Sequence, residues 1–336
     1  MSQRFVKWLL VAVGSLLLML LAILWSLSTG EVHIAIGDIP SFMLDGESME
    51  HLILTRIRIP RILLALSVGG SLSLAGAIMQ GIFRNPLVEP YTLGISGGAA
   101  LGVSFAIVMG LVGSMGIVAL PVSGFLGAVS TIFIVFAFSR MRNGINIHNM
   151  LLVGIMISFV ASVLMMLLMS ITTRDNMNHI MFWTMGSLNQ SDFRFIALSM
   201  VTAIIGLCLS YVFVHTLNAL RLGESKARYL GLDVKNSIRI LFFIASMLTG
   251  VSVAVAGIIG FVGLVIPHIV RLLSGSDHRI LLGASFVGGA TFLVFCDTLS
   301  RIVIAPNELP IGVITGIAGG GVFIVVLLRN RKKRYA

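Results

Sequence analysis

The chain is a series of apolar runs, most of them about as long as a lipid bilayer is thick. A helix needs about 20 mostly apolar residues to cross the hydrocarbon core. Such runs occupy residues 8–27, 62–83, 93–111, 117–138, 150–171, 195–214, 240–256, 258–273, 281–304 and 311–328. Backbone groups in lipid must be paired within their own segment, so each run is expected to be a helix. We therefore predict an all-α, polytopic membrane protein with about ten transmembrane helices, in a range of eight to ten.

The composition excludes a soluble protein. Of the 336 residues 57% are hydrophobic and only 11% are charged, whereas soluble domains carry about 25% charged residues. The two cysteines lie in apolar runs without metal-ligand spacing, so we expect no metal site. The first apolar run is too long for a signal peptide and is expected to remain as a spanning helix. Residues 1–336 are predicted to form a single transmembrane domain.

The charge distribution predicts the orientation. An even number of spans places both termini on one face, together with the loop at about residues 218–238. Lysine and arginine mark cytoplasmic loops. Most of the basic residues share the face of the termini, so both termini are expected to be cytoplasmic and no nucleic-acid partner is expected despite the net charge of +10. The other basic residues fall on the outer side: Arg56, Arg58, Arg61, Arg174, Arg194 and Arg301.

Few ionisable residues fall near or within the spans, and each has a structural and a functional interpretation. The outer cluster around Arg58 and Arg61 either snorkels to the membrane interface or docks an acidic external partner. Asp297 and Arg301 are spaced i and i+4, so they can pair on one helix face. His268 is more often a packing residue than a ligand in this setting.

The loop at 218–238 is too polar to lie in lipid, and the spacing of its glycines and charged residues indicates an ordered structure. Gly223 and Gly231 bracket one predicted short helix, because glycine suits the left-handed residue that ends a helix. Asp233 can cap a second short helix. Such a loop favours contact with a soluble partner. A phosphate loop needs Gly-Lys-Ser/Thr, and no lysine here follows a glycine, so ATP-driven work would be done by another chain.

Several segments resemble one known family over most of the chain, from about residue 50 to the C-terminus. They are Ile57-Arg58-Ile59-Pro60-Arg61, Gly76-Ala77-Ile78-Met79-Gln80, Arg84-Asn85-Pro86-Leu87-Val88-Glu89-Pro90, Leu222-Gly223-Glu224 with Ala227 and Leu230-Gly231, the stretch 260–271, Asp277-His278-Arg279, and Glu308-Leu309-Pro310-Ile311-Gly312. Their order and separations are similar to those of the permease subunit of iron-siderophore, haem and cobalamin ABC importers, the type II importers.

The resemblance implies a cobalamin-importer-permease-like bundle in the bacterial cytoplasmic membrane, surrounded by lipid. It implies a second permease subunit (a copy or a paralogue), two separate ABC ATPase subunits that bind the ATP, and an extracytoplasmic substrate-binding protein. The chain itself would then be no enzyme and would hold no cofactor. A ferric siderophore is the favoured cargo among ferric chelates, with haem or cobalamin as the alternative.

The family's functional positions map onto nine residues of this chain, none of them catalytic. The loop would couple to the ATPase, the outer arginines would dock the binding protein, and the turn after the second span would help form the inner gate. The coupling positions are Glu224, Ala227, Arg228 and Gly231; the docking positions are Arg58, Arg61 and Arg301; the gate positions are Asn85 and Leu87. A second gate segment is expected near residues 143–149, with no residue assigned.

Two other classes of protein remain as alternatives. An ion-coupled secondary transporter would need a coupling site, and the spans show no convincing buried acidic pair. An intramembrane enzyme would need a nucleophile with its base or a metal cluster, and His268 has no such neighbour in its own span.

Overall fold

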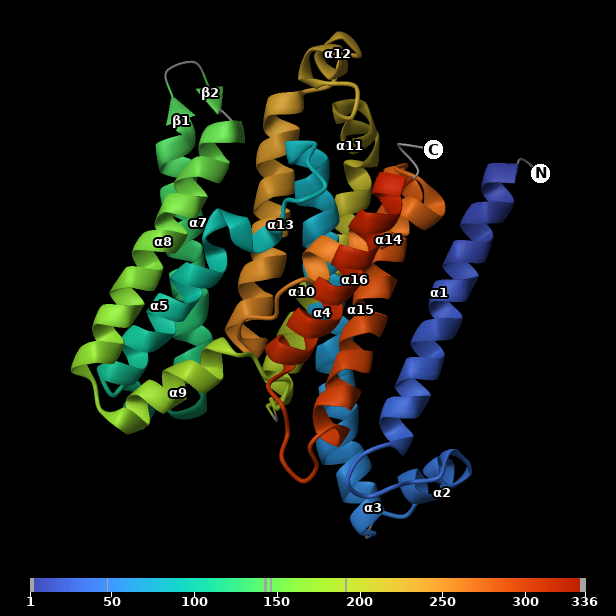
Figure 1. Cartoon of the computed structure of the whole chain (residues 1–336), viewed down its shortest axis with the longest axis vertical. Helices are drawn as coiled ribbons and strands as arrows, with labels where there is room; N and C mark the ends of the chain where they lie inside the picture. The colour runs from blue at the N-terminus through green and yellow to red at the C-terminus, as the bar shows by residue number, and fades with distance from the viewer. Residues whose placement is uncertain (1–2, 47, 142–143, 146, 191, 333–336) are drawn as a thin grey trace.

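The computed structural model describes residues 3–46, 48–141, 144–145, 147–190 and 192–332, which fold into a bundle of helices (Figure 1). The α-helices are α1 Gln3–Ser28, α2 Ile39–Leu44, α3 Met49–Leu52, α4 Ile59–Phe83, α5 Ile95–Val108, α6 Leu111–Met115, α7 Ala119–Ser139, α8 Ile147–Ile171, α9 Arg174–Thr184, α10 Phe193–Val212, α11 Val214–Leu220, α12 Glu224–Tyr229, α13 Val234–Ala256, α14 Val262–Ser274, α15 His278–Ile302 and α16 Ile311–Lys332.

Short elements of other kinds join these helices. Three 3₁₀ turns cover Ile36–Asp38, Pro90–Leu93 and Gly116–Val118, and a π-helical turn covers Ile53–Arg58. This π turn leads directly into Pro60, whose missing N–H and bulky ring do not fit inside a regular helix. An antiparallel pair of two-residue strands, β1 Arg140–Met141 and β2 Gly144–Ile145, is the one departure from the predicted all-α fold in the part described.

The predicted apolar runs are confirmed as helices. Within the described residues, seven helices are long and apolar enough to cross a membrane, and three shorter apolar helices cover Ile95–Val108, Val262–Ser274 and Ile311–Val325. The shorter three correspond to the predicted runs 93–111, 258–273 and 311–328. Glycines with positive φ, among them Gly116 and Gly257, separate neighbouring runs.

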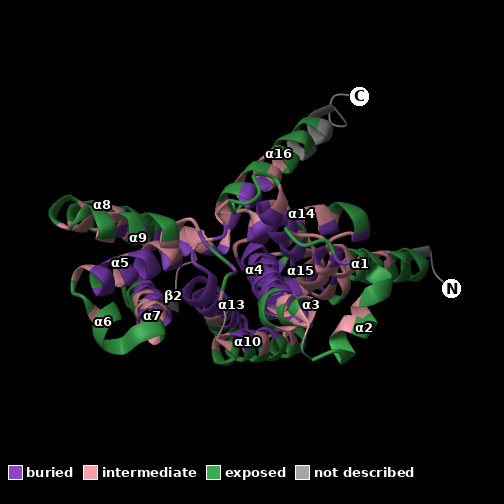
Figure 2. Ribbon diagram, turned by 90° about the horizontal axis from the view of Figure 1, so that it is seen from below, coloured by how far each residue is buried: buried purple, intermediate pink, exposed green. Residues whose placement is uncertain are grey.

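Helix α4 forms the centre of the molecule. It packs against α10, α13, α14 and α15, while α5, α7, α8 and α9 form a group to one side and α1 lies at the opposite edge (Figure 1). Figure 2 shows α4 and α13 largely buried and α1 and α8 largely exposed. In the apolar window of α4, 89% of the residues are buried, against 11% in α1 and in α8. The exposed helices are as apolar as the buried one, which fits a lipid-facing surface.

Small residues allow the close contacts around α4. A Cβ atom at Gly76 would collide with the carbonyl oxygen of Gly263 in α14, and one at Gly69 would collide with that of Gly289 in α15. Gly98 and Gly102 let α5 approach α7 in the same way. In lipid, where the hydrophobic effect does not drive helix association, such backbone contact supplies van der Waals attraction.

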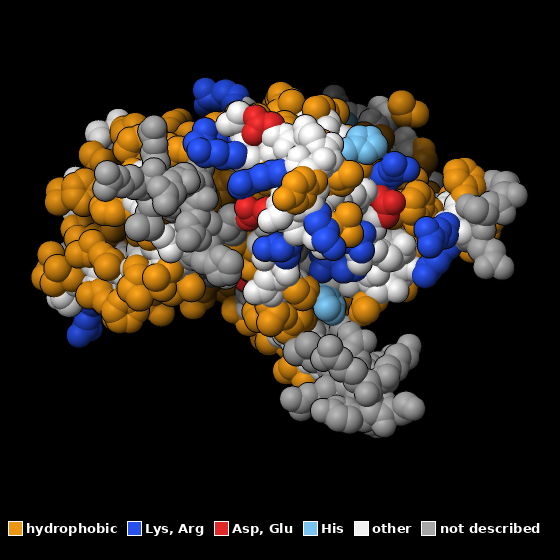
Figure 3. Space-filling view, turned by 90° about the horizontal axis from the view of Figure 1, so that it is seen from above, with side chains coloured by type: hydrophobic (Ala, Val, Ile, Leu, Met, Phe, Trp, Pro, Cys, Tyr) orange, Lys and Arg blue, Asp and Glu red, His pale blue; other side chains and the backbone are white. Residues whose placement is uncertain are grey.

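The two ends of the bundle are formed by different elements. The start of α1, the end of α16 and α12 lie at one end, here called the α12 end, while α2 and α3 lie at the other, the α3 end (Figure 1). The predicted placement of the 218–238 loop beside both termini is thus confirmed. Lys and Arg side chains gather over the middle of the α12 end (Figure 3).

Candidate functional site

The loop at 218–238 forms one short helix rather than the two predicted. Gly223 (φ 106°) precedes α12 and Gly231 (φ 80°) follows it, so both glycines occupy the backbone region that side chains disfavour. Asp233 does cap a helix, because its side chain accepts a hydrogen bond from the backbone N–H of Asn236. That helix is α13, a spanning helix. The prediction of a second short helix was wrong, because the polar residues 234–236 form the first turn of α13, which continues into the next apolar run.

Helix α12 presents one face outward and buries the other. Glu224 and Arg228 lie one turn apart, with 3.6 Å between Oε2 and Nη2. Ala227 is fully buried in the core, and its carbonyl oxygen accepts a hydrogen bond from Leu232 N–H. The side chain of Ala227 therefore fastens α12 to the bundle. Glu224, Ala227, Arg228 and Gly231 remain predicted coupling positions.

Sequence reasoning missed two residues at the C-terminal end of α12. Tyr229 is 91% exposed and Leu230 is 64% exposed, so both project from the α12 end. Large apolar side chains in solvent at the tip of a short helix are typical of a contact surface. The available signal was their position, since they are the bulky apolar residues between the charged turn of α12 and Gly231.

The predicted gate residues lie in the turn that ends α4. Arg84 adopts a left-handed conformation (φ 52°), and the Oδ1 atom of Asn85 accepts a hydrogen bond of 3.0 Å from Leu87 N–H. Asn85 and Leu87 are both exposed. The Arg84 guanidinium lies beside Gly223, so the gate turn and the start of α12 are neighbours. Residues 143 and 146 of the second expected gate segment fall outside the described residues.

The segment that follows the gate turn is attached to the start of α14. Glu89 Oε1 accepts a hydrogen bond of 2.8 Å from Phe261 N–H, and the Tyr91 hydroxyl accepts one of 3.3 Å from Ile259 N–H. Phe261 has a positive φ of 69°, which is uncommon for a bulky residue. A movement of the gate turn can therefore reach the loop between α13 and α14.

At the α3 end, the predicted docking residue Arg61 lies in a buried ionic cluster. Its Nε and Nη2 atoms donate to Asp297 Oδ1 at 3.2 and 2.9 Å, and Nη1 donates to the two Glu308 carboxylate oxygens at 2.7 and 2.9 Å. The side chain of Arg61 is 6% exposed and that of Asp297 is 1% exposed, but that of Glu308 is 47% exposed. Glu308 thus forms the solvent-facing part of the cluster.

The other two docking arginines hold the end of α1. Arg301 Nη2 donates to the Ser26 hydroxyl at 2.7 Å, and Arg58 donates to the carbonyl oxygens of Leu27 and Val32. The predicted pairing of Arg301 with Asp297 is confirmed at 3.2 Å between Nε and Oδ2. The contact between Nε and Oδ2 is an ion pair without a hydrogen bond, because the Nε–H group donates instead to the carbonyl oxygen of Asp297.

Docking at these three arginines stays a prediction, with a new constraint. All three are buried within the chain, so an external carboxylate would compete with Asp297 and Glu308 for Arg61. Arg56, which belongs to the same sequence cluster, is exposed.

His268 is held by packing alone among the residues described. Its ring meets that of Phe323 edge-on, with 6.0 Å between centroids, and neither ring nitrogen has a hydrogen-bond partner. The same described residues contain no group of three His, Cys, Asp or Glu side chains that could hold a metal ion.

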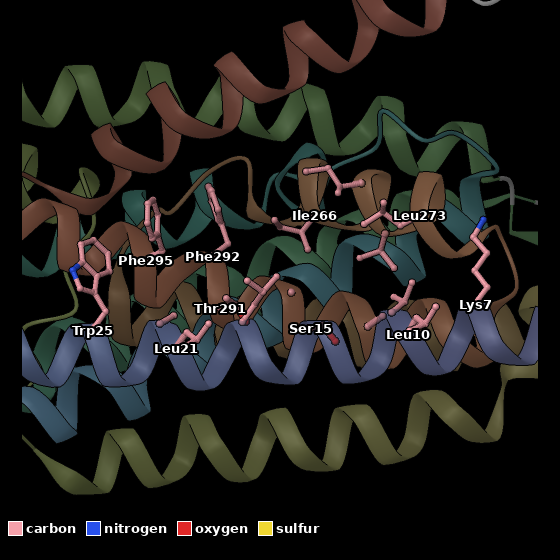
Figure 4. A pocket seen from close by; sticks show the side chains of 18 residues that line it. Lys7, Leu10, Ser15, Leu21, Trp25, Ile266, Leu273, Thr291, Phe292 and Phe295 are labelled. Carbon is pink, nitrogen blue, oxygen red and sulfur yellow. The ribbon is translucent and has the colours of Figure 1, made fainter. Parts of the chain in front are cut away.

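A large groove runs between α1 and the α14–α15 pair (Figure 4). Its volume is about 770 Å³, and aliphatic and aromatic side chains such as Leu10, Ile266 and Phe292 dominate its lining. Lys7 and Ser15 supply a few polar atoms. A groove of this composition suits lipid chains and not a polar chelate.

Comparisons with known proteins find similar sequences and a similar solved structure. Residues 17–329 match the FecCD transport family. The chain is 40% identical to the hemin transport system permease protein HmuU of Yersinia pestis, covering 86% of each. It is 38% identical to the vitamin B12 import system permease protein BtuC of Shigella boydii, covering 98% of each. A solved inward-facing ABC transporter, assigned to the metal-chelate type, aligns with a TM-score of 0.85 and 32% identity, over 95% of this chain and 98% of that one.

Proposed function

The chain belongs to the FecCD transport family, and from this premise we propose that it takes up ferric siderophores as the permease subunit of an ABC importer. The observation that carries the proposal is α12, a six-residue helix whose last residue, Tyr229, and whose C-cap, Leu230, face solvent. A spanning bundle gains nothing from exposing such a surface unless another chain covers it.

The energy for transport is proposed to come from two ABC ATPase subunits that dock at the α12 end. This chain has no phosphate loop of its own. Arg84 lies beside Gly223, so a push on α12 would reach the gate turn through one side chain. The turn would then pass the displacement to α14 through Glu89 and Phe261. ATP and cargo would thus bias the bundle between inward-open and outward-open states.

The orientation follows from this docking. The α12 end is proposed to face the cytoplasm of a bacterial cell, and the α3 end to receive the extracytoplasmic binding protein. Glu308, half exposed beside Arg61, supports a role for the ionic cluster in that contact. A second copy or a paralogue of the chain would complete the translocation path.

Haem or cobalamin is the second candidate cargo. It is supported by the names of two relatives, which transport hemin and vitamin B12. Ion-coupled transport has less support: Asp297, a fully buried acid, is paired with Arg61 and Arg301 and thus unavailable as an ion ligand.

Affinity purification of the intact complex from its native membrane, followed by mass spectrometry, tests the assembly. We expect an ATP-binding chain and a binding protein; purification without any ATP-binding chain would refute the proposal. Uptake of radiolabelled iron as ferric siderophore, compared with haem and cobalamin in the same cells, tests the cargo. A deletion strain complemented with this chain should recover ferric siderophore uptake, and recovery of haem or cobalamin uptake alone would assign the alternative cargo.

A further inference from the structure

A small polar cavity lies at the α12 end, where the ends of four helices meet. Its volume is about 210 Å³, several times the share of about 30 Å³ that one water takes in the liquid. It is lined by Gln80, Gly81, Arg84, Pro86, Arg221, Arg271, Ser276 and His278. These residues come from the end of α4, the residue after α11, the last turn of α14 and the start of α15.

Three arginines line this cavity, and no carboxylate does. None of Arg84, Arg221 and Arg271 forms an ion pair with any described residue. The nearby carboxylate of Asp277 is not part of the lining, and its Oδ1 atom accepts hydrogen bonds from the Asn218 amide and from the backbone N–H that follows His278. The three arginines therefore meet no carboxylate in the cavity wall itself.

Helix dipoles offset only part of this charge. The arginines lie at the C-terminal ends of α4, α11 and α14, and each such end carries roughly half a negative charge. The N-terminal end of α15, which also lies at the cavity, adds roughly half a positive charge, so the positive charge exceeds the negative dipole charge by roughly two units. Hydrogen bonds also hold the side chains of the cavity wall in place. The buried Gln80 donates to the carbonyl oxygens of Gly263 and Leu264, which turns its Oε1 atom toward Arg271 Nη2 at 3.0 Å.

His278 adds an acceptor to this basic cavity. The Asn218 side chain donates its amide N–H to Asp277 and accepts the His278 backbone N–H at 2.9 Å, so its Oδ1 atom faces the ring. The ring Nδ1 lies 2.9 Å from the same Oδ1, and must therefore carry the proton. In the neutral ring Nε2 is then a bare acceptor. It is buried, has no partner among the described residues, and points at Gly81 in the cavity wall.

We propose that this cavity binds a phosphate-type oxyanion that keeps an O–H group. Its charged oxygens lie against Arg84, Arg221 and Arg271, and its O–H donates to the Nε2 atom of His278. A carboxylate or a sulfate would satisfy the arginines but has no O–H for Nε2 at neutral pH. The ligand is inorganic phosphate or a phosphomonoester lipid headgroup, which share this chemistry. The site is independent of the cargo and joins the gate turn to the residues that flank α12.

Direct binding to the purified full-length chain in a neutral detergent tests this site. One arm measures radiolabelled inorganic phosphate by equilibrium dialysis, with sulfate as competitor. The other arm uses native mass spectrometry with phosphatidic acid, a monoester, against phosphatidylmethanol, a diester without a hydroxyl. Both are run near pH 6, where a monoester with a second pKa of about 6 keeps its O–H in about half of the molecules. The arm that binds identifies the source of the phosphate group.

We expect one bound phosphate group per chain, with sulfate or the diester at least tenfold weaker. Arg221→Gln should weaken binding at least tenfold, whereas the matched control Arg279→Gln, an exposed arginine outside the cavity, should change it less than twofold. If Arg221→Gln fails to fold, Arg84→Gln, at the exposed rim, takes its place. The proposal is overturned if neither arm binds, if sulfate competes as well as phosphate, or if Arg279→Gln weakens binding as much as the cavity variants.

Discussion

Replacing Asp297 by Asn tests how the buried ionic cluster at the α3 end stabilises the fold. The substitution keeps the size of the side chain and removes its charge. Arg61 and Arg301, whose side chains are 6% and 7% exposed, then share no buried counter-ion. Removing one partner of a buried ion pair costs about 3–5 kcal/mol, because an uncompensated charge stays in a poorly solvated place. We expect Asp297→Asn to lower the free energy of unfolding by about that amount.

The assay is equilibrium unfolding of the purified chain in mixed micelles of mild detergent and dodecyl sulfate, followed by far-ultraviolet circular dichroism. Glu308→Gln is the matched control, since it removes the other carboxylate that binds Arg61. Glu308 is 47% exposed, so solvent screening should limit its effect to about 0–1 kcal/mol.

The double variant Arg61→Gln/Asp297→Asn completes a thermodynamic cycle. If the cost arises from an unpaired buried guanidinium, removing Arg61 as well should recover part of the loss, with a coupling of at least about 1 kcal/mol. Equal effects of Asp297→Asn and Glu308→Gln, or purely additive single effects in the cycle, would refute the reasoning.

Three further predictions concern the helix contacts and their ends. Gly76→Ala should lower the yield of folded protein on size-exclusion chromatography, because its Cβ would collide with the backbone of α14; Gly316→Ala, where nothing lies within 4 Å, should not, and equal yields would count against this packing. Gly231→Leu should leave the bundle folded but uncouple ATP hydrolysis from uptake in proteoliposomes, since Gly231 has a φ of 80°; normal coupling would contradict a role for this turn. Burial raises the pKa of the Asp277 carboxyl group, but hydrogen bonds from the Arg279 backbone N–H and from the Asn218 amide outweigh burial and lower the pKa overall. The ionised carboxylate therefore stabilises the fold above the ordinary aspartate pKa of about 3.9, and this stabilisation is lost as pH falls through the lower pKa of the folded state. Asp277→Asn should remove this loss from the acid side of a curve of stability against pH.

The features that could be read from the sequence are those that depend on local composition. The ten apolar runs required helices because lipid offers no hydrogen bonds to the backbone. The polar loop between Gly223 and Gly231 indicated a short helix outside the membrane. The pairing of Asp297 with Arg301 followed from their spacing on one helix.

The features that could not be read depend on contacts between distant segments. Arg61 and Asp297 are 236 residues apart, and no local pattern joins them. Arg58, Arg61 and Arg301 were predicted on the outer side from the order of the spans, and as docking positions from the family resemblance. Their burial depends on carboxylates and carbonyl groups that α15, the loop after it and the end of α1 supply.

The sequence also could not predict which side of α12 faces the bundle, as Ala227 shows. A six-residue helix has one side against the bundle and one toward solvent, and the sequence alone does not say which residue takes which side. The structure buries Ala227 and exposes Tyr229.

Site-specific photo-crosslinking tests most directly the central claim that an ATP-binding chain drives this permease through α12. A photoreactive phenylalanine at position 229, which is 91% exposed at the α12 end, should crosslink to an ATP-binding chain in native membranes. The same group at position 44, which is 89% exposed at the α3 end, should capture no ATP-binding chain. Capture of an ATP-binding chain from position 44 and none from position 229 would contradict the account.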